Sequence, residues 1–431
     1  MSNNLIKPSI LAGFMELLPE EQAIFNDIAD KIKNVYEKNG CRGIDTPIIE
    51  KAEVLLAKSG GETEKQVYSF EKGKKNLALR FDLTVPFARY CAQYYNDLVF
   101  PFKRYQIGKV YRGERNQKGR YREFYQCDVD VIGREKLSID NDAWVISLAS
   151  KAFKKIGLTD YKFQISNRKI LKGIFNEMEV HNTSEIMTLI DKYDKIGKNE
   201  FISECENILG KEKSSYLNKI LDIDGSSENI FEYFNKLNIK NLEFCEGINE
   251  LKRVTEILEV LGVSKSEYII NLKIIRGLDY YTGTVFETLL CGNESYGSIC
   301  SGGRYDNLAG KYTDKILPGV GISIGLTRLF FVLKEIGFIK NYKIENKFDY
   351  LILPIGDTLN YCGIVLKSLQ EKGYGAAIYF ENDSLKKQLK YADKCGASNV
   401  IIIGEDEMKT NVVTIKNMIS GQNTTIDYKL I

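Results

Sequence analysis

The chain has 431 residues and a net charge of +2, with 44% hydrophobic and 27% charged residues. These values are typical of a globular protein with a buried core, and the length corresponds to roughly three domains. The near-neutral balance excludes a broadly basic nucleic-acid coat, although it is compatible with a local basic surface.

Nine cysteines are spread along the chain without a C-x-x-C pair, which argues against a zinc knuckle and against a disulfide framework. Reduced thiols favour a cytoplasmic protein. The N-terminal residues lack the pattern of a signal peptide, and no apolar run approaches the length of a membrane span. The single histidine, His181, lies in a polar stretch, which favours an exposed loop residue over a catalytic triad or a multi-histidine metal site.

Residues 17–39 predict an amphipathic helix, because apolar side chains recur at three- and four-residue steps and Gly40 follows as a stop. GIDTPIIE (43–50) is a short apolar stretch that contains Pro47, so it predicts an edge strand. Residues 77–95 predict a strand, a turn and then a helix, with Pro86 in an early helical turn where proline is tolerated.

Charged side chains crowd residues 112–126, RGERNQKGRYREFYQ, which contain four arginines, one lysine and two glutamates. Strand-like segments on both sides predict a hairpin that carries these charges. Guanidinium groups bind phosphate oxygens in pairs, and a ring such as Phe124 can stack on a flat base. The stretch therefore indicates a phosphate-bearing ligand, with a charged surface hairpin as the alternative.

Neither a P-loop nor a G-x-G-x-x-G fingerprint after a strand occurs in the chain. Side chains would then have to bind the phosphates, and arginines can stabilise charge at phosphorus without a side-chain base. Asp82, Asp128 and Asp130 lie in apolar surroundings, where a carboxylate needs a partner. That partner is either a cation of the protein or an amine or ring N–H of a ligand.

The residue pattern changes after about residue 166. Residues 166–261 predict a helical insertion, residues 276–290 a strand, and residues 319–333 a glycine-rich strand that runs into a helix. After a break near 336–347, alternating strands and helices predict a small α/β domain. Lys386, Lys390 and Lys394 share one helix face there, which is either a solvated face or a contact to a phosphate backbone.

Five motifs and the C-terminal segment, in order, resemble a known family. Residues 17–50 are similar to motif 1 of class II aminoacyl-tRNA synthetases, GKVYRGERNQKGRYREFYQCDVDVIG to motif 2, and GVGISIGLTRLFFVL to motif 3. RGLDYYTGTVFE and SGGRYDNL resemble two peptides of the histidyl-tRNA synthetase family, and the C-terminal segment resembles its anticodon-binding domain. The chain departs from the family at Thr327, where motif 3 often carries glutamate, and a small loss of support for Arg328 is expected. Asp82 stands where many bacterial members carry glutamate.

The resemblance implies an α+β class II synthetase catalytic domain, with an antiparallel sheet flanked by helices, a helical insertion and a C-terminal α/β anticodon-binding domain. The expected domains are a catalytic core at 1–165 and 262–335, the insertion at 166–261 and the anticodon-binding domain at 346–431. The implied enzyme is a ligase that converts L-histidine and ATP into histidyl-adenylate and pyrophosphate, then transfers histidine to tRNA(His). The resemblance also implies Mg²⁺ on the triphosphate, a homodimer and a cytoplasmic location without membrane contact.

The family's functional positions carry over residue by residue. Arg112 would hold the α-phosphate, with Arg276 as the second catalytic arginine. Glu114 would contact the adenine amino group, Phe124 would stack on the ring, and Arg120 and Arg328 would hold the outer phosphates. The residues implied for histidine are Asp82, Thr84, Gln126, Asp130, Arg276, Tyr280, Tyr281 and Tyr305. Lys386 and Lys390 are implied for tRNA, and no residue is implied as a metal ligand.

Two other interpretations are consistent with parts of this pattern. The regulatory subunit of ATP phosphoribosyltransferase keeps the fold and a histidine pocket, but such relatives generally lack the last domain and often lose the arginines that bind ATP. Arg112, Arg120, Arg276 and Arg328 are all present here, which favours the enzyme. A synthetase-like sensor fused to other modules would need a further domain, and the sequence predicts none.

Overall fold

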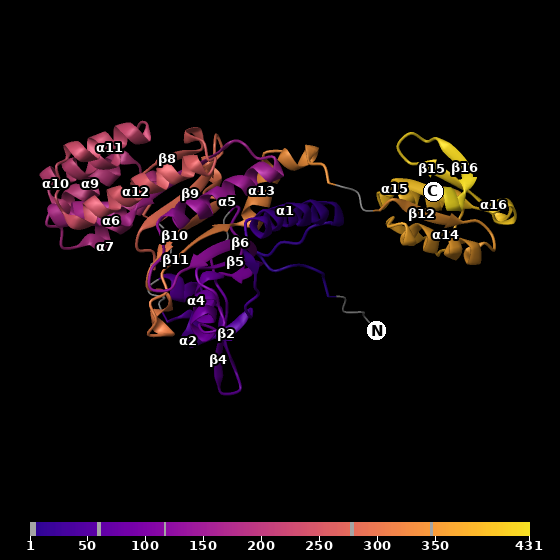
Figure 1. Ribbon diagram of the computed structural model, residues 1–431, viewed down its shortest axis with the longest axis horizontal. Helices are drawn as coiled ribbons and strands as arrows, with labels where there is room; N and C mark the ends of the chain where they lie inside the picture. The colour runs from indigo at the N-terminus through magenta and orange to yellow at the C-terminus, as the bar shows by residue number, and fades with distance from the viewer. Residues whose placement is uncertain (1–5, 58–61, 116–117, 276–279, 345–347) are drawn as a thin grey trace. The chain divides into compact units, whose positions relative to one another are not determined.

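The computed structural model describes residues 6–57, 62–115, 118–275, 280–344 and 348–431. The chain divides into two compact units, residues 1–342 and 343–431, which are described separately (Figure 1). No helix of the described residues is long and apolar enough to cross a membrane.

The main sheet of the first unit has eight strands in the order β1-β5-β6-β11-β10-β9-β7-β8. Its central strands pair antiparallel, whereas β1 pairs parallel with β5 at one edge and β8 parallel with β7 at the other. The predicted antiparallel sheet is therefore confirmed, with a parallel strand added at each edge. The strands are β1 Arg42–Gly43, β5 Phe102–Tyr111, β6 Glu123–Ile132, β7 Tyr161–Asn167, β8 Tyr268–Ile270, β9 Thr284–Leu290, β10 Cys300–Tyr305 and β11 Gly319–Ile324.

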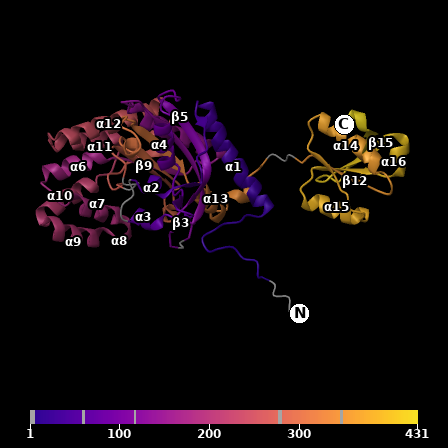
Figure 2. The same cartoon turned by 90° about the horizontal axis from the view of Figure 1, so that it is seen from below.

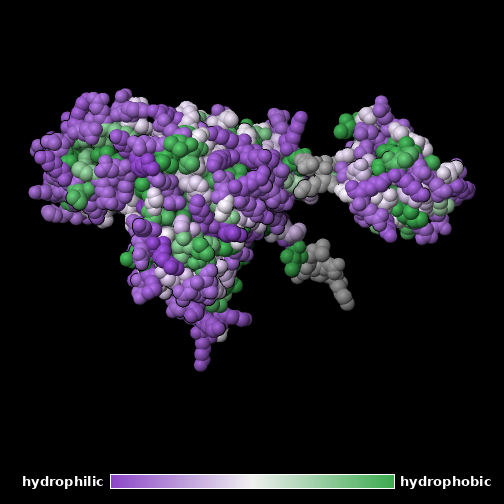
Figure 3. Space-filling model, viewed as in Figure 1, coloured by the Kyte–Doolittle hydropathy of each residue, from purple (hydrophilic) through white to green (hydrophobic). Residues whose placement is uncertain are grey.

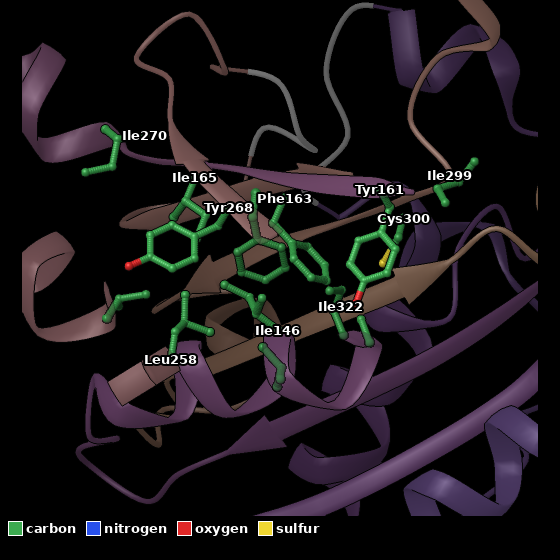
Figure 4. Packing of buried hydrophobic residues seen from close by; sticks show 14 of the residues in the cluster. Ile146, Tyr161, Phe163, Ile165, Leu258, Tyr268, Ile270, Ile299, Cys300 and Ile322 are labelled. Atoms are coloured by element: carbon green, nitrogen blue, oxygen red, sulfur yellow. The ribbon is translucent and has the colours of Figure 1, made fainter. Parts of the chain in front are cut away.

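Long helices cover one face of this sheet and enclose the largest hydrophobic core. They are α1 Pro19–Lys38, α5 Asp140–Ile156, α12 Leu242–Val260 and α13 Leu326–Glu335. Figure 4 shows Ile146 and Leu258 from two of these helices facing Phe163 and Ile322 of the sheet. Apolar residues at helical spacing form this layer, as the sequence predicted for the helix at 17–39 and the strand-helix at 319–333.

A second, smaller core lies on the opposite face of the sheet, and it includes the buried residues of α4 and α2. The elements of this layer are α2 Ala52–Leu55, α3 Glu62–Gln66, α4 Thr84–Gln93 and a three-stranded sheet of β2 Ile49–Lys51, β4 Lys75–Leu79 and β3 Ser69–Lys72. The β3–β4 hairpin projects from the unit (Figure 1) and is hydrophilic at its tip (Figure 3).

The prediction of a single edge strand at residues 43–50 is wrong. The chain leaves β1 at Gly43 and begins β2 at Ile49, so the segment serves the edges of two different sheets. Pro47 lies between them and has no N–H to donate to a ladder. The edge position was right, but one strand could not continue through the proline.

The predicted helical insertion consists of seven helices at one end of the unit, as Figures 1 and 2 show. They are α6 Arg168–Glu177, α7 Thr183–Asp191, α8 Tyr193–Ile196, α9 Lys198–Leu209, α10 Lys211–Leu221, α11 Ser227–Lys236 and α12. Helix α12 returns to the main sheet and packs beside α5 and α6. The insertion is thus joined to the catalytic layers through its first and last helices. The domain limits given above remain predictions.

The C-terminal unit has a five-stranded sheet in the order β13-β12-β14-β15-β16. Its strands are β12 Tyr350–Pro354, β13 Ala376–Ile378, β14 Asn399–Ile403, β15 Val412–Asn417 and β16 Asn423–Asp427, and its helices are α14 Leu359–Glu371, α15 Leu385–Lys394 and α16 Glu405–Thr410. The sequence interpretation ended at VVTIK and missed β16, because that largely exposed polar strand lacks apolar alternation. Pairing with β15 makes it a strand.

Candidate functional site

Strand β6 sends alternate side chains to opposite faces of the main sheet. Val129 and Val131 enter the large core, so Asp128 and Asp130 point to the other face. Gly321 of the neighbouring β11 faces the same side, and a Cβ there would lie 1.9 Å from Asp130 Oδ1. The glycine-rich strand therefore leaves the space that the buried carboxylate occupies.

One cavity on this face is lined by the motif 2 hairpin and α13, and we call it the arginine cavity. Its lining consists of Arg112, Glu114, Gly119, Arg120, Tyr121, Phe124, Gln126, Ser298, Ile299, Cys300, Ser301, Ser323, Gly325 and Arg328. All five residues predicted to bind ATP lie in that lining. Residues from segments far apart in the sequence thus meet as the resemblance implied.

The arginine cavity carries an excess of positive charge. Arg120 Nη1 donates to Glu114 Oε2 at 3.2 Å, and Arg328 donates to the carbonyls of Gly119 and Ser298 at 3.2 and 3.0 Å. Burial lowers the pKa of Arg328, and repulsion from Arg120 and Arg112 lowers it further. A bound anion would relieve this repulsion, so the cavity suits a polyphosphate.

Arg112 lies where the motif 2 hairpin approaches the start of α4. Its Nε donates to the carbonyl of Phe81 at 3.0 Å, and its guanidinium carbon lies 5.1 Å from the ring centroid of Phe124. Its charge also lowers the pKa of Asp82, although burial raises that pKa more. Arg112 therefore acts electrostatically both on the arginine cavity and on the neighbouring carboxylate.

The second cavity, which we call the carboxylate cavity, adjoins the first because Ser301 and Ser323 line both. Its lining consists of Thr84, Asp128, Asp130, Tyr281, Ser301, Tyr305, Gly321, Ile322 and Ser323. Four residues predicted to bind histidine are among them. A fifth, Gln126, lies in the arginine cavity and donates from Nε2 to Ser323 Oγ at 2.8 Å.

Tyr280, also predicted for histidine, contacts the lining of the carboxylate cavity, and Asp82, another predicted residue, is hydrogen-bonded to Tyr280. The Tyr280 hydroxyl donates to Asp82 Oδ2 at 3.2 Å, while Asp82 Oδ1 accepts from Val85 N at 3.0 Å. The Tyr280 ring lies 5.1 Å from the ring of Tyr281 and 5.9 Å from that of Tyr305. Arg276 lies outside the described residues.

Asp130 has two partners within the protein. Arg104 Nη2 lies 2.6 Å from Asp130 Oδ2, and the Tyr305 hydroxyl donates to Oδ1 at 2.8 Å. The sequence left open a salt bridge or a ligand contact, and the structure shows the salt bridge on a carboxylate that also lines a cavity. Sequence reasoning missed Arg104, although it stands directly opposite Asp130 across the predicted hairpin. Cross-strand pairing of opposite charges was the signal that could have found it.

Thr327 shows what replaces the glutamate of motif 3. Its hydroxyl accepts a hydrogen bond from Tyr125 N at 2.8 Å and is buried at 1% exposure. The threonine thus ties α13 to β6 behind Phe124. In the C-terminal unit, Lys386 and Lys390 are exposed on α15, while their neighbour Lys387 pairs with Asp383.

Asp128 should make stability depend on pH. Burial raises its pKa to about 7, against an opposing effect of Arg104 and with added repulsion from Asp130. Between about pH 4 and about pH 7 the folded carboxyl holds a proton that the unfolded one has lost, so stability falls as pH rises. In Asp128→Asn this contribution, at most about 1.4 kcal/mol per pH unit, should disappear.

Urea unfolding followed by Trp144 fluorescence measures this effect, since the chain's single tryptophan lies in the first unit. The variant should gain stability relative to the parent at pH 8 and lose that advantage near pH 4. Asp97→Asn, at an exposed position of the same unit, is the control. A stability difference that stays constant with pH would contradict the expected titration.

The sheet, the arginine cavity and the carboxylate cavity together have the features expected of a class II aminoacyl-tRNA synthetase. The sequence profile of the histidyl-tRNA synthetase family matches residues 13–329, and the profile of an anticodon-binding domain matches residues 349–430. The chain belongs to the histidyl-tRNA synthetase family.

Relatives and solved structures agree with this assignment. The histidine–tRNA ligase of Clostridium acetobutylicum is 61% identical, with 99% of both chains covered, and that of Clostridium tetani is 48% identical, with 99% of this chain and 97% of the relative covered. The crystal structure of histidyl-tRNA synthetase from Nostoc sp. PCC 7120 is similar, with 36% identity, a TM-score of 0.88, and 99% of this chain and 98% of that chain covered.

A structure from Bacillus halodurans bears on the alternative interpretation. This ATP phosphoribosyltransferase regulatory subunit/histidyl-tRNA synthetase has 22% identity and a TM-score of 0.77, with 93% of this chain and 100% of that chain covered. At that identity the likeness concerns the fold alone. It does not weigh against the ligase assignment.

Proposed function

We propose that this chain activates L-histidine with ATP, forming histidyl-adenylate and pyrophosphate, and then transfers the histidyl group to tRNA(His). The observation that carries the proposal is the pair of adjoining cavities, one cationic with an aromatic ring and one lined by carboxylates and tyrosines. They share Ser301 and Ser323, so a substrate in each would meet at that junction.

Arg112 and Arg328 stabilise charge during activation in this proposal. One carboxylate oxygen of histidine bonds to the α-phosphorus, and the bond to the pyrophosphate oxygen breaks with its electron pair leaving on pyrophosphate. No side-chain base is needed, because the attacking carboxylate is already ionised. Arg112 holds the α-phosphate, while Arg120 and Arg328 hold the outer phosphates, so preorganised positive charge meets the charge that develops. Arg276 is the further catalytic arginine of the proposal.

In this proposal, Phe124 and Glu114 bind the adenine ring. Phe124 lines the arginine cavity, where its ring could stack on the base once the phosphates engage Arg112. Glu114 accepts from the adenine amino group, and its present hydrogen bond with Arg120 keeps its carboxylate within the cavity.

The imidazole is recognised by a donor and an acceptor at its two nitrogens. Asp130 accepts from the ring N–H, and the Tyr281 hydroxyl donates to the other nitrogen. Asp82, Thr84 and Gln126 bind the ammonium group, with Tyr280 and Tyr305 supporting the two carboxylates. An amino acid without ring nitrogens would leave these groups unpaired, so strong discrimination is expected.

Magnesium accompanies the triphosphate in the proposal. In the described ranges no group of three or more histidine, cysteine, aspartate or glutamate side chains could hold a metal ion. Phosphate oxygens would therefore supply most of the ligands, as Mg²⁺ commonly accepts. The ion would neutralise charge on the phosphates.

We also propose a cytoplasmic homodimer. All nine cysteines are free, which suits a reducing compartment. Around the motif 1 segment Leu18, Ile48 and Ile49 expose 77%, 42% and 48% of their surface. Exposed apolar side chains such as these are compatible with a surface that another copy covers.

Amino-acid-dependent ATP–pyrophosphate exchange with all twenty amino acids tests the function. Exchange with histidine alone would establish activation and the pocket together, and charging of tRNA(His) would complete the reaction. Absence of exchange with retained histidine binding would instead support the regulatory-subunit interpretation.

The exposed lysines of α15 should contribute to tRNA binding. Replacing Lys386 and Lys390 with alanine is expected to weaken binding and to reduce the slope of log affinity against log salt by about one to two, while histidine activation is unchanged. Filter binding of tRNA(His) at several salt concentrations measures the slope. Lys367→Ala with Lys409→Ala, exposed on α14 and α16, is the matched control. An unchanged slope in the α15 variant would identify that helix face as merely solvated.

A further inference from the structure

Arg168, the first residue of the insertion helix α6, contacts the backbone beside the carboxylate cavity. Its Nη1 donates to the carbonyl of Tyr281 at 2.7 Å and its Nη2 to the carbonyl of Ile275 at 2.8 Å. Its backbone N–H donates to the carbonyl of Gly283 at 3.0 Å. One residue thus holds the chain at three points close to a tyrosine that lines the cavity.

An arginine suits this position for a geometric reason. The two carbonyls lie six positions apart in the sequence, and the planar guanidinium can donate to both from separate nitrogens. A lysine offers a compact ammonium that cannot hold two acceptors in the same fixed fork. The guanidinium carbon also lies 5.9 Å from the ring centroid of Tyr281, so the side chain bears on the ring as well as on the backbone.

The base of Arg168 is itself firmly placed. Asn167, the residue before it, is fully buried, caps α6 by accepting from Lys169 N at 3.0 Å, and donates to Glu250 of α12 at 2.8 Å. Lys169 forms ion pairs with Glu246 and Glu250 at 2.7 Å. The guanidinium therefore projects from the junction of the first and last insertion helices.

The insertion also contacts the chain just before Ile275. Lys273 lies two residues before Ile275, and its Nζ is 3.3 Å from Asp222 Oδ1 at the end of α10. It also lies 4.2 Å from the ring centroid of Tyr193 in α8. Residues 273–275 are thus joined to the insertion both at α6 and at α8 and α10.

We propose that Arg168 is a positioning residue for histidine recognition, which sets the place of Tyr281 and thereby couples the helical insertion to the amino-acid pocket. The inference rests on the proposed function, because it assigns Tyr281 to the imidazole. Arg168 acts through Tyr281 and does not touch the substrate. A change in the position of α6 would therefore move Tyr281 and alter the amino-acid pocket.

Steady-state ATP–pyrophosphate exchange tests the inference through the separate KM values for histidine and ATP. Arg168→Gln is expected to raise the KM for histidine about tenfold and to leave the KM for ATP within about twofold, since one charged hydrogen bond at Tyr281 is lost. Arg168→Lys, whose ammonium keeps the charge and can donate to one of the two carbonyls, should lie between the parent and the glutamine variant.

Lys169→Gln is the matched control on the same helical turn. It removes the ion pairs between α6 and α12 without removing a hydrogen bond to Tyr281 or Ile275, so both KM values should stay near those of the parent. A KM for histidine that rises equally in both variants would overturn the inference, because general loosening of the insertion would then explain the effect.

A double variant separates positioning from general support. If Arg168 acts through the Tyr281 hydroxyl, Arg168→Gln should raise the KM for histidine much less in a Tyr281→Phe background than in the parent. Equal increases in both backgrounds would contradict the coupling. Should the glutamine variant fail to fold, Arg168→Lys is measured in the same cycle.

The parent protein in the same assay distinguishes failure of this inference from failure of the proposed function. Histidine-dependent exchange by the parent with an unchanged KM in the Arg168 variants would overturn only this inference. Failure of the parent to exchange would overturn the proposed function itself.

Discussion

Replacing Arg112 with alanine is expected to lower kcat/KM for histidine-dependent ATP–pyrophosphate exchange by about a hundred- to a thousandfold. The reason is its place in the arginine cavity, close to Asp82. Its charge lowers the pKa of Asp82 beside the carboxylate cavity and also that of Arg328 in the arginine cavity. In the proposed reaction, this positive group would stabilise the negative charge that develops on the reacting phosphate.

The control for Arg112→Ala is Lys109→Gln in the same hairpin. Lys109 pairs with Glu123 at 2.7 Å, and a partly exposed pair of this kind is worth little. Its variant should keep activity within about twofold, which corresponds to less than about 0.5 kcal/mol. A folded Arg112→Ala protein with near-normal exchange would remove Arg112 from the proposed chemistry. Thermal unfolding of each variant separates lost catalysis from lost structure.

Arg304→Ala should destabilise the first unit by about 3–5 kcal/mol, because it leaves a buried carboxylate uncompensated. Arg304 Nη2 lies 2.7 Å from Asp142 Oδ1, and its other donors reach the carbonyls of Leu137 and Ser138 at 3.2 and 3.0 Å. Asp142 has no exposed surface. The pair fixes β10, which carries Tyr305, to the start of α5.

The loss in Arg304→Ala should grow as the pH rises. Burial raises the pKa of Asp142 in the folded state, and Arg304 opposes that rise. Without the arginine the pKa should rise further, so the folded state can take up a proton at low pH that the unfolded state has lost above about pH 4. Destabilisation should therefore be smaller at pH 5 than at pH 8.

Urea unfolding followed by Trp144 fluorescence measures the loss of stability and its dependence on pH, since Trp144 lies in α5 two residues after Asp142. Arg304→Met combined with Asp142→Leu is the control, because replacing a buried ion pair with apolar side chains is often nearly neutral. Equal losses at pH 5 and pH 8 in Arg304→Ala would show that lost packing, not the unpaired carboxylate, causes the effect.

Local pattern determined much of this protein in advance. Period-2 and helical periodicities, proline positions and turn residues predicted α1, the hairpin of β5 and β6, and the strand-helix of β11 and α13, and the structure confirms each. Five ordered motifs indicated the family, which the comparisons confirm. These features depend on residues close together in the chain, and such information is fully present in the sequence.

Only the tertiary structure decided how distant segments complete the site. Ser301 and Ser323 join the two cavities because β10 and β11 pair with each other and β11 pairs with β6. Arg168 reaches Tyr281 across 113 positions of the chain, and β16 is a strand because β15 offers it a ladder. Sheet order and packing set these contacts, and local periodicity does not encode them. The sequence by itself thus determined most of the elements and the family, whereas the folded sheet determined which side chains share a cavity.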